Sequence, residues 1–315
     1  MLKQDSSSIK GFLTILIIIG HNHIVAPQSS PLMAYLYTFH VVCFFILPWL
    51  YDNRKELTIN NIGNIIYRNW IPYMIFFAFS LGVFTLFEGK HPNAAGVFSA
   101  FVTGSQKLLK ENAGFFFLWF LPTFCTFSIL KLGADNKKWM LCLLTVLSII
   151  TFWVPWREAE WMKNNLPFGI YVALRYFVYG VIVSLMLRWM EWTKYVGATA
   201  FVWLSYLYWT GNINWYGIVM MPIAGFMFII SILPLLRMKW LRAIGNYSLP
   251  IYLTHVYIYN ALELVVPNTM VWGVLALIIT VIIAYIASVI IYKIDFIRKL
   301  VFPRSFKEWK GLLKF

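Results

Sequence analysis

Ten long stretches of apolar residues alternate with short polar segments along the chain. Each approaches the length of about 20 residues that a helix needs to cross a bilayer. We predict spans at 10–27, 33–51, 70–87, 114–132, 138–156, 168–187, 195–209, 215–236, 246–265 and 269–292. The expected fold is therefore an all-α, polytopic integral membrane protein. It is expected to form a single domain over residues 1–315, with a transmembrane bundle over 10–294 and a basic tail over 295–315.

The basic residues between these spans predict the orientation of the chain. With the N-terminus in the cytoplasm, the cytoplasmic loops and span ends carry 20 Lys or Arg residues, and the opposite loops carry five. Such an excess is typical of the cytoplasmic side of a membrane protein. It favours an even number of spans with both termini cytoplasmic. In the longest outer loop, 88–113, residues 94–109 are expected to form a short interfacial helix.

Composition supports a membrane protein and narrows its partners. Hydrophobic residues make up 61% of the chain and charged residues 12%, whereas soluble domains contain about half and about a quarter. The net charge of +14 is explained by cations facing anionic lipid headgroups, so nucleic acid is not an expected partner. The three cysteines, Cys43, Cys125 and Cys142, lie in apolar spans, so we expect neither a disulfide framework nor a metal site.

Two ionisable residues in the first span are the strongest candidates for a functional site. Lys10 and His21 are separated by ten uncharged residues, so on a helix their side chains lie within about 20° of one face. The imidazole then lies about 16 Å deeper than the ammonium. An ionisable side chain at that depth in a membrane indicates function by default.

Three further polar side chains fall inside apolar spans: His40, Arg175 and His255. Facing lipid would be costly for each of them, so they are expected to face the protein interior or a water-filled cavity. Helical spacing also places Tyr252 on the same face as His255. Each histidine could instead serve only as a helix–helix hydrogen bond. A purely structural role for Arg175 is as well supported as anion binding.

These residues belong to motifs that resemble a known family. Lys10, ten residues and His21 resemble the Arg/Lys-x10-His motif of membrane acyltransferase family 3. Four later segments resemble motifs of that family in the same order: Phe39-His40 with Phe44-Phe45, Arg68 with Pro72-Tyr73, Trp119-Phe120-Leu121, and Gly245 and Ser248 with Tyr252-Leu253-Thr254-His255. The resemblance extends over essentially the whole chain and agrees with ten spans and cytoplasmic termini.

Two positions depart from the family pattern. Many members have an Asp three residues before the Arg/Lys, where this chain has Ser7, with Asp5 two residues earlier. Many also have Gly after the paired Phe residues, where this chain has Ile46. The chain ends at Phe315, so it resembles the stand-alone members that lack a fused extracytoplasmic domain.

The resemblance implies an O-acyltransferase of the bacterial inner membrane. Such enzymes transfer an acyl group, usually acetyl from cytoplasmic acetyl-CoA, to a hydroxyl of a cell-surface glycan or its lipid-linked precursor. A surface polysaccharide such as O-antigen is the commonest acceptor that the stand-alone relatives imply. Several details stay open: the acceptor sugar, an acetyl or a succinyl donor, and the oligomeric state.

The expected roles follow from the motif positions. Lys10 and Arg68 are expected to bind the phosphates of acetyl-CoA, since cations suit phosphate groups. His21 is expected to be the general base, or else to carry the acetyl group covalently. His40 would orient the base or bind the thioester. The residues expected at the oxyanion or the acceptor are Arg175, His255, Trp119 and Tyr252.

Two other classes of protein fit part of this pattern. A secondary transporter or exporter of an envelope component would also have buried His and Arg residues and interrupted spans, such as those with Pro122, Pro222 and Pro250. Transporters often contain two halves with matching interruptions, and the sequence shows no such correspondence. A non-catalytic partner in envelope assembly would tolerate loss of His21 as long as the fold survives.

Overall fold

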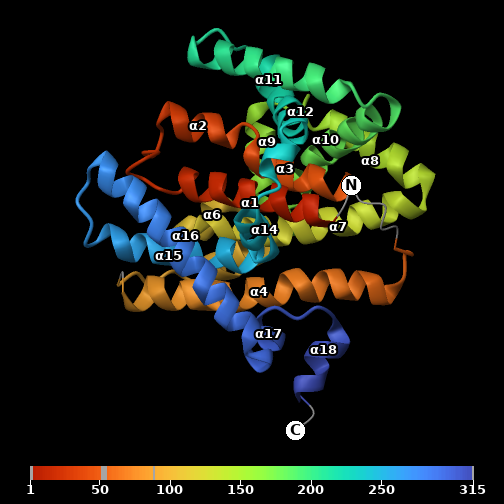
Figure 1. The fold of residues 1–315 in the computed structure, drawn as a ribbon. Coiled ribbons are helices and arrows are strands. Elements are labelled where there is room, and N and C mark those ends of the chain that lie inside the picture. Colours follow the sequence, from red (N-terminus) through yellow and green to blue (C-terminus); the bar gives the residue numbers. More distant parts are fainter. Residues whose placement is uncertain (1–2, 51–54, 88, 314–315) are drawn as a thin grey trace. The chain divides into compact units, whose positions relative to one another are not determined.

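A computed structural model describes residues 3–50, 55–87 and 89–313, and within these ranges the chain is helical and contains no β-strand (Figure 1). The prediction of an all-α membrane protein is therefore confirmed. The helices form two compact units. The first comprises the described residues of Met1–Tyr51 and Tyr179–Ile290, and the second those of Asp52–Val178 and Ile291–Phe315.

The first unit is built around α1, which packs against α14, α15 and α3. Apolar side chains of α1, such as Ile9, Leu13 and Ile18, are fully buried in this core. Its helices are α1 (Lys3–Gly20), α2 (Pro31–Tyr37), α3 (His40–Ile46), η1 (Leu47–Leu50), α11 (Thr193–Trp209), α12 (Trp215–Ser231), α13 (Leu233–Leu236), α14 (Lys239–Asn246), α15 (Ser248–Glu263) and α16 (Met270–Lys293).

The second unit is organised around α4, which packs against α7, α6, α17 and α18. Its helices are α4 (Ile59–Leu86), α5 (Ala94–Thr103), α6 (Gln106–Ala113), η2 (Phe116–Trp119), α7 (Phe120–Asn136), α8 (Lys138–Ile150), α9 (Trp156–Asn165), η3 (Pro167–Gly169), α17 (Asp295–Val301), α18 (Phe306–Lys310) and η4 (Gly311–Leu313). The helix α10 (Ile170–Trp189) begins in this unit and ends in the first, and the last three residues of α16, 291–293, also belong to this unit.

Within the described ranges, five helical segments are long and apolar enough to cross a membrane. They are Pro31–Leu50, Ile59–Leu86, Phe116–Asn136, Pro167–Trp189 and Met270–Lys293. Each overlaps one of the ten predicted spans, although α4 begins eleven residues before the predicted span at 70–87. The other five predicted spans overlap α1, α8, α11, α12 with α13, and α15. The number of crossings and the cytoplasmic position of both termini stay predictions.

Two further predicted boundaries differ from the structure for local reasons. The first span, predicted at 10–27, is the helix Lys3–Gly20. The predicted outer helix at 94–109 is two helices, α5 and α6. Gly104 ends α5 with a left-handed φ of 62°, and the Ser105 hydroxyl accepts a hydrogen bond from Leu108 N–H to begin α6. A glycine followed by a serine N-cap is a common way to separate two helices.

Glycines allow α1 and α14 to approach each other closely (Figure 1). A Cβ atom at Gly11 would lie 2.0 Å from the carbonyl oxygen of Leu241, and one at Gly245 would lie 1.7 Å from that of Ser7. Both distances are far below a van der Waals contact, so only glycine fits at either position. Helices in membranes commonly associate through small residues in this way.

Polar side chains join the start of α1 to the same neighbour. The Ser7 hydroxyl donates a hydrogen bond of 2.8 Å to Asn246 Oδ1. Asp5 is buried and accepts two hydrogen bonds from the Arg237 guanidinium, at 2.8 and 3.3 Å. Ser7, which departs from the family pattern, and Asp5, two residues earlier, therefore both contribute to the contact between α1 and the segment around α14.

Asn22 fixes the turn that ends α1. Its side chain is fully buried, and Oδ1 accepts hydrogen bonds from the backbone N–H groups of Ile24 and Val25, at 3.1 and 3.0 Å. The Tyr259 hydroxyl of α15 donates to the same oxygen at 3.0 Å, and Asn22 Nδ2 donates to the Gly273 carbonyl of α16 at 2.8 Å. One amide therefore stops the helix and ties its end to two others.

The basic tail folds back onto α4. Phe306 and Trp309 lie beside the Tyr67 ring, and Phe306 N–H donates to Asn64 Oδ1. Arg298 is buried and pairs with Asp295 at 2.8 Å and with Glu308 at 2.6 Å. The hydrogen bond from Arg298 lowers the pKa of the Glu308 carboxyl below its ordinary value of 4.5. An internal ion pair thus holds together the segment that the sequence identifies only as a basic tail.

We expect Gly245→Ala to destabilise the protein by about 3 kcal/mol, because the added methyl group overlaps the Ser7 carbonyl and forces α1 away from α14. Gly63→Ala on α4 is the matched control, since a Cβ there meets no described atom within 4 Å. Its higher helix propensity should stabilise α4 by up to about 1 kcal/mol. Thermal unfolding of the two purified variants measures the difference, and equal midpoints would contradict a close helix contact.

We expect Asn22→Leu to destabilise the protein by about 2–3 kcal/mol, because it leaves the Val25 N–H and the Tyr259 hydroxyl without their acceptor and leaves the Ile24 N–H with the Tyr259 hydroxyl alone. Tyr259→Phe removes a single hydroxyl and should cost about 1 kcal/mol. Denaturant unfolding compares the two variants, and hydrogen exchange over residues 21–26 reports the turn itself. A loss for Asn22→Leu no larger than that for Tyr259→Phe would show that the turn does not depend on this amide.

Candidate functional site

His21 is the first residue beyond α1, and it lies against His255 of α15. Its backbone N–H still bonds to the Ile17 carbonyl at 3.0 Å, so the helical path from Lys10 to His21 is continuous. Nδ1 of His21 lies 2.7 Å from Nε2 of His255. Both side chains are buried, at 8% and 0% exposed. The structure therefore brings together two histidines that the sequence placed on separate spans.

The two imidazole rings meet edge to edge. Their planes are inclined by only 6°, and their centroids are 5.0 Å apart. Rings stacked face to face would keep about 3.5 Å between their planes, which nitrogens 2.7 Å apart exclude. In the edge-to-edge arrangement an N–H of one ring points at the lone pair of the other. This geometry allows a strong hydrogen bond and the transfer of a proton along it.

His40 and two tyrosines surround the pair within the first unit. The Tyr37 ring lies 6.3 Å from the His21 ring and 4.9 Å from the His40 ring, measured between centroids. His40 is buried and donates from Nδ1 to the Leu36 carbonyl across the break between α2 and α3. The Tyr252 ring lies 5.9 Å from that of His255. The predicted residues His21, His40, Tyr252 and His255 therefore form one cluster.

Lys10 lies on α1 about three turns before His21. Its side chain is half-buried, and its carbonyl accepts a hydrogen bond of 2.7 Å from the Thr14 hydroxyl. The first unit therefore contains a cation at one end of a straight helical path and a pair of imidazoles at the other. Arg68 lies on α4 of the second unit, where its side chain is exposed.

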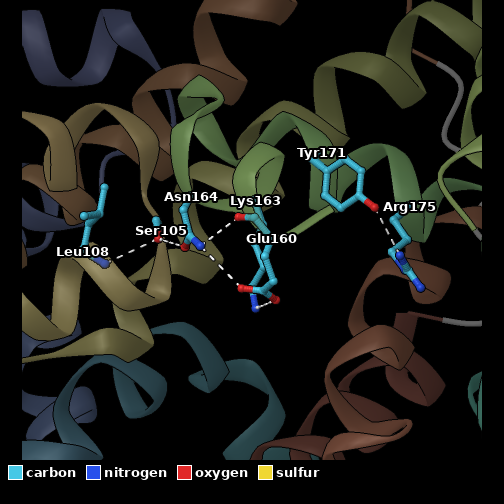
Figure 2. A network of polar contacts seen from close by, with 7 residues as sticks. All are labelled: Ser105, Leu108, Glu160, Lys163, Asn164, Tyr171 and Arg175. Carbon is cyan, nitrogen blue, oxygen red and sulfur yellow. Dashed lines mark hydrogen bonds and ion pairs between the residues drawn. The ribbon is translucent and has the colours of Figure 1, made fainter. Parts of the chain in front are cut away.

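Arg175 has structural partners within the second unit. Its guanidinium donates from Nη1 to the Thr151 carbonyl at 3.3 Å. The same nitrogen donates to the Tyr171 hydroxyl at 3.2 Å (Figure 2). It also lies 4.6 Å from the centre of the Phe152 ring, in a cation–π contact. These contacts favour the structural interpretation of Arg175 that the sequence left open.

Trp119 and the outer helices also belong to the second unit. Trp119 is buried at the end of η2, and its carbonyl accepts a hydrogen bond from the Thr123 hydroxyl. Asn164 of α9 receives a hydrogen bond from the Ser105 hydroxyl at 2.6 Å and donates to Glu160, which also pairs with Lys163 (Figure 2). This network fixes α9 against the start of α6 and has the character of a scaffold.

The sequence interpretation missed two contributors to the cluster, Asn22 and Tyr37. Asn22 directly follows His21, and a polar amide beside a buried histidine is a signal that could have identified it. Tyr37 lies between the two histidine motifs, but its place beside His21 depends on the break at Thr38 and Phe39, where φ of Phe39 is −138°. The described residues contain no group of three or more His, Cys, Asp or Glu side chains suited to a metal ion.

Comparison with known proteins gives one match. No curated protein and no solved structure matches the chain. A family model described as an acyltransferase domain matches residues 7–293, which cover both units and include Lys10, His21, His40 and His255. The chain therefore belongs to the membrane acyltransferase family 3.

Proposed function

We propose that the protein transfers an acetyl group from cytoplasmic acetyl-CoA to a hydroxyl of a cell-surface glycan or its lipid-linked precursor, in a bacterial inner membrane. The observation that carries this proposal is the buried pair of His21 and His255 at the end of α1, in a chain that belongs to an acyltransferase family. An imidazole beside a second imidazole can accept and return a proton, which acyl transfer to a hydroxyl requires.

In the direct route, His21 acts as the general base. As the hydroxyl oxygen attacks the thioester carbonyl, its proton passes to His21, and a tetrahedral intermediate forms. The C–S bond then breaks, the electron pair leaves with sulfur, and the imidazolium returns the proton to give CoA and the acetyl ester. A positioned base of this kind contributes about 10²–10⁴-fold to the rate.

In the second route, the acetyl group passes through His21. The imidazole nitrogen attacks the thioester carbonyl and displaces the CoA thiolate, which takes up the proton released by the ring. The acceptor hydroxyl then attacks the acetyl-imidazole and gives its proton back to His21 as the ester forms. Both routes have the same products and require the same residue.

The ammonium of Lys10 can bind the phosphates of the donor. The distance from Lys10 to His21 is similar to the distance that the extended arm of the donor must span. The helical path between them corresponds to about 16 Å. An anionic end held by the ammonium would leave the extended arm free to follow α1 toward the histidines. Phosphate binding by Arg68 stays a prediction from the sequence, where its planar guanidinium suits bidentate contact.

We expect His21→Ala to abolish transfer while CoA still binds, because the substitution removes the base but not the cation. Purified protein in vesicles is supplied with radiolabelled acetyl-CoA and a glycan acceptor, and the ester formed is counted. The rate should fall by about 10²–10⁴-fold. His91→Ala, at an exposed histidine of the second unit, is the control and should keep the wild-type rate. Transfer by His21→Ala at a near wild-type rate would refute this role.

We expect Lys10→Ala to raise the KM for acetyl-CoA about tenfold, equivalent to about 1.4 kcal/mol of binding free energy. Lys10→Arg keeps the charge and should remain close to wild type. Lys107→Ala, at an exposed lysine of α6, removes a cation elsewhere and should leave the KM unchanged. Titration of the initial rate with acetyl-CoA measures all three, and an unchanged KM in Lys10→Ala would remove Lys10 from the donor site.

A further inference from the structure

The hydrogen bonds of His255 determine which of its ring nitrogens carries a proton. Its Nδ1 lies 2.7 Å from the Tyr252 backbone carbonyl, three residues earlier on α15. A carbonyl oxygen only accepts hydrogen bonds, so Nδ1 of His255 must be the donor. In the uncharged imidazole the other nitrogen, Nε2, then holds a lone pair. That nitrogen is the one that faces His21.

The protonation of His255 in turn determines which ring nitrogen of His21 carries a proton. Since Nε2 of His255 accepts in the uncharged pair, Nδ1 of His21 donates across the 2.7 Å between them. An uncharged imidazole carries one proton, so Nε2 of His21 holds the lone pair. The Tyr252 carbonyl thus sets the orientation of a chain of two hydrogen bonds, and the chain leaves the basic nitrogen of His21 on the side away from His255.

Neighbouring contacts hold the two imidazole rings in this hydrogen-bonded orientation. Tyr259 lies one helical turn beyond His255 on α15, and its hydroxyl donates to Asn22 Oδ1 at 3.0 Å. Two adjacent residues of the α1 terminus, His21 and Asn22, are therefore bound by two side chains on one face of α15. A ring flip of His21 would have to break the first of these contacts while the second still holds the chain in place.

We propose that His255 is a positioning residue that fixes His21 in the tautomer protonated at Nδ1, so that Nε2 of His21 is the nitrogen that takes the proton or the acetyl group. The proposal rests on the proposed function for the chemistry at His21, and it replaces the role at the acceptor that the sequence suggested for His255. It resembles the way in which catalytic imidazoles are oriented by a third group, here with a neutral imidazole in place of a carboxylate.

The arrangement also stabilises the imidazolium form of His21 that arises during the reaction. When Nε2 of His21 takes the hydroxyl proton, the ring becomes an imidazolium, and the bond from its Nδ1–H to His255 becomes charge-assisted and therefore stronger. The pair thus stabilises the cation that general-base catalysis creates. On return of the proton to sulfur, both rings regain their starting tautomers, so the cycle closes without a net change in either histidine.

The first test reads the tautomer directly and does not depend on activity. Nitrogen-15 NMR of histidine-labelled protein in vesicles distinguishes protonated from unprotonated ring nitrogens, and the His21 signals are assigned by their loss in His21→Ala. We expect a protonated Nδ1 and an unprotonated Nε2 for His21. A His21 protonated at Nε2, or at both nitrogens, at neutral pH would overturn the proposal even if the acetyl-transfer activity were real.

The second test separates positioning from packing. His255→Gln retains a side-chain oxygen that can accept from Nδ1 of His21, whereas His255→Leu retains bulk alone. We expect His255→Leu to lower kcat by about 10–100-fold with the KM for acetyl-CoA unchanged, and His255→Gln to restore most of the loss. His91→Gln, at an exposed histidine of the second unit, is the control and should keep the wild-type kcat. Equal kcat values for the Gln and Leu variants, each with a wild-type unfolding midpoint, would contradict the proposal.

Discussion

The turn at Asn22, directly after α1, is the constraint on which the candidate site depends. A helix that continued through residues 21–27, as the apolar pattern predicts, would keep His21 in a regular turn and leave no backbone N–H for a side chain to bind. Asn22 instead accepts from two N–H groups of the following turn and reaches both α15 and α16. Unpaired backbone groups are expensive in a lipid environment, so a helix can end there only where such partners exist.

The two ends of α1 are held by different kinds of contact. At the first end, Gly11 and Gly245 allow close packing of α1 against α14, and the Asp5–Arg237 ion pair joins α1 to the residues just before α14. At the second end, α1 is joined to α15 by the hydrogen bond that Asn22 accepts from Tyr259 and by the contact of His21 with His255. Lys10 lies in the first region, and His21 forms part of the second. The residues proposed for donor binding and for chemistry are thus supported by separate sets of neighbours.

Much of this organisation could be predicted from the sequence, because apolar length and helical spacing are local properties. They place all ten helical stretches and identify Lys10, His21, His40 and His255 as polar side chains in apolar surroundings. The nitrogen-to-nitrogen contact between His21 and His255 is not a local property, since 234 residues separate the two. The fold of the tail could not be predicted either. Its net positive charge does not indicate that Arg298 and Glu308 pair with each other.

The close contact at Gly11 and Gly245 also limits how this part of the molecule can move. With carbonyl oxygens lying against both glycines, α1 cannot slide along α14 by even one residue without a collision. A response to a ligand at Lys10 must therefore move the two helices together or leave both in place. The distance between Lys10 and His21 along the helix is therefore fixed. A donor that contacts both residues must have a similar distance between its anionic group and its thioester.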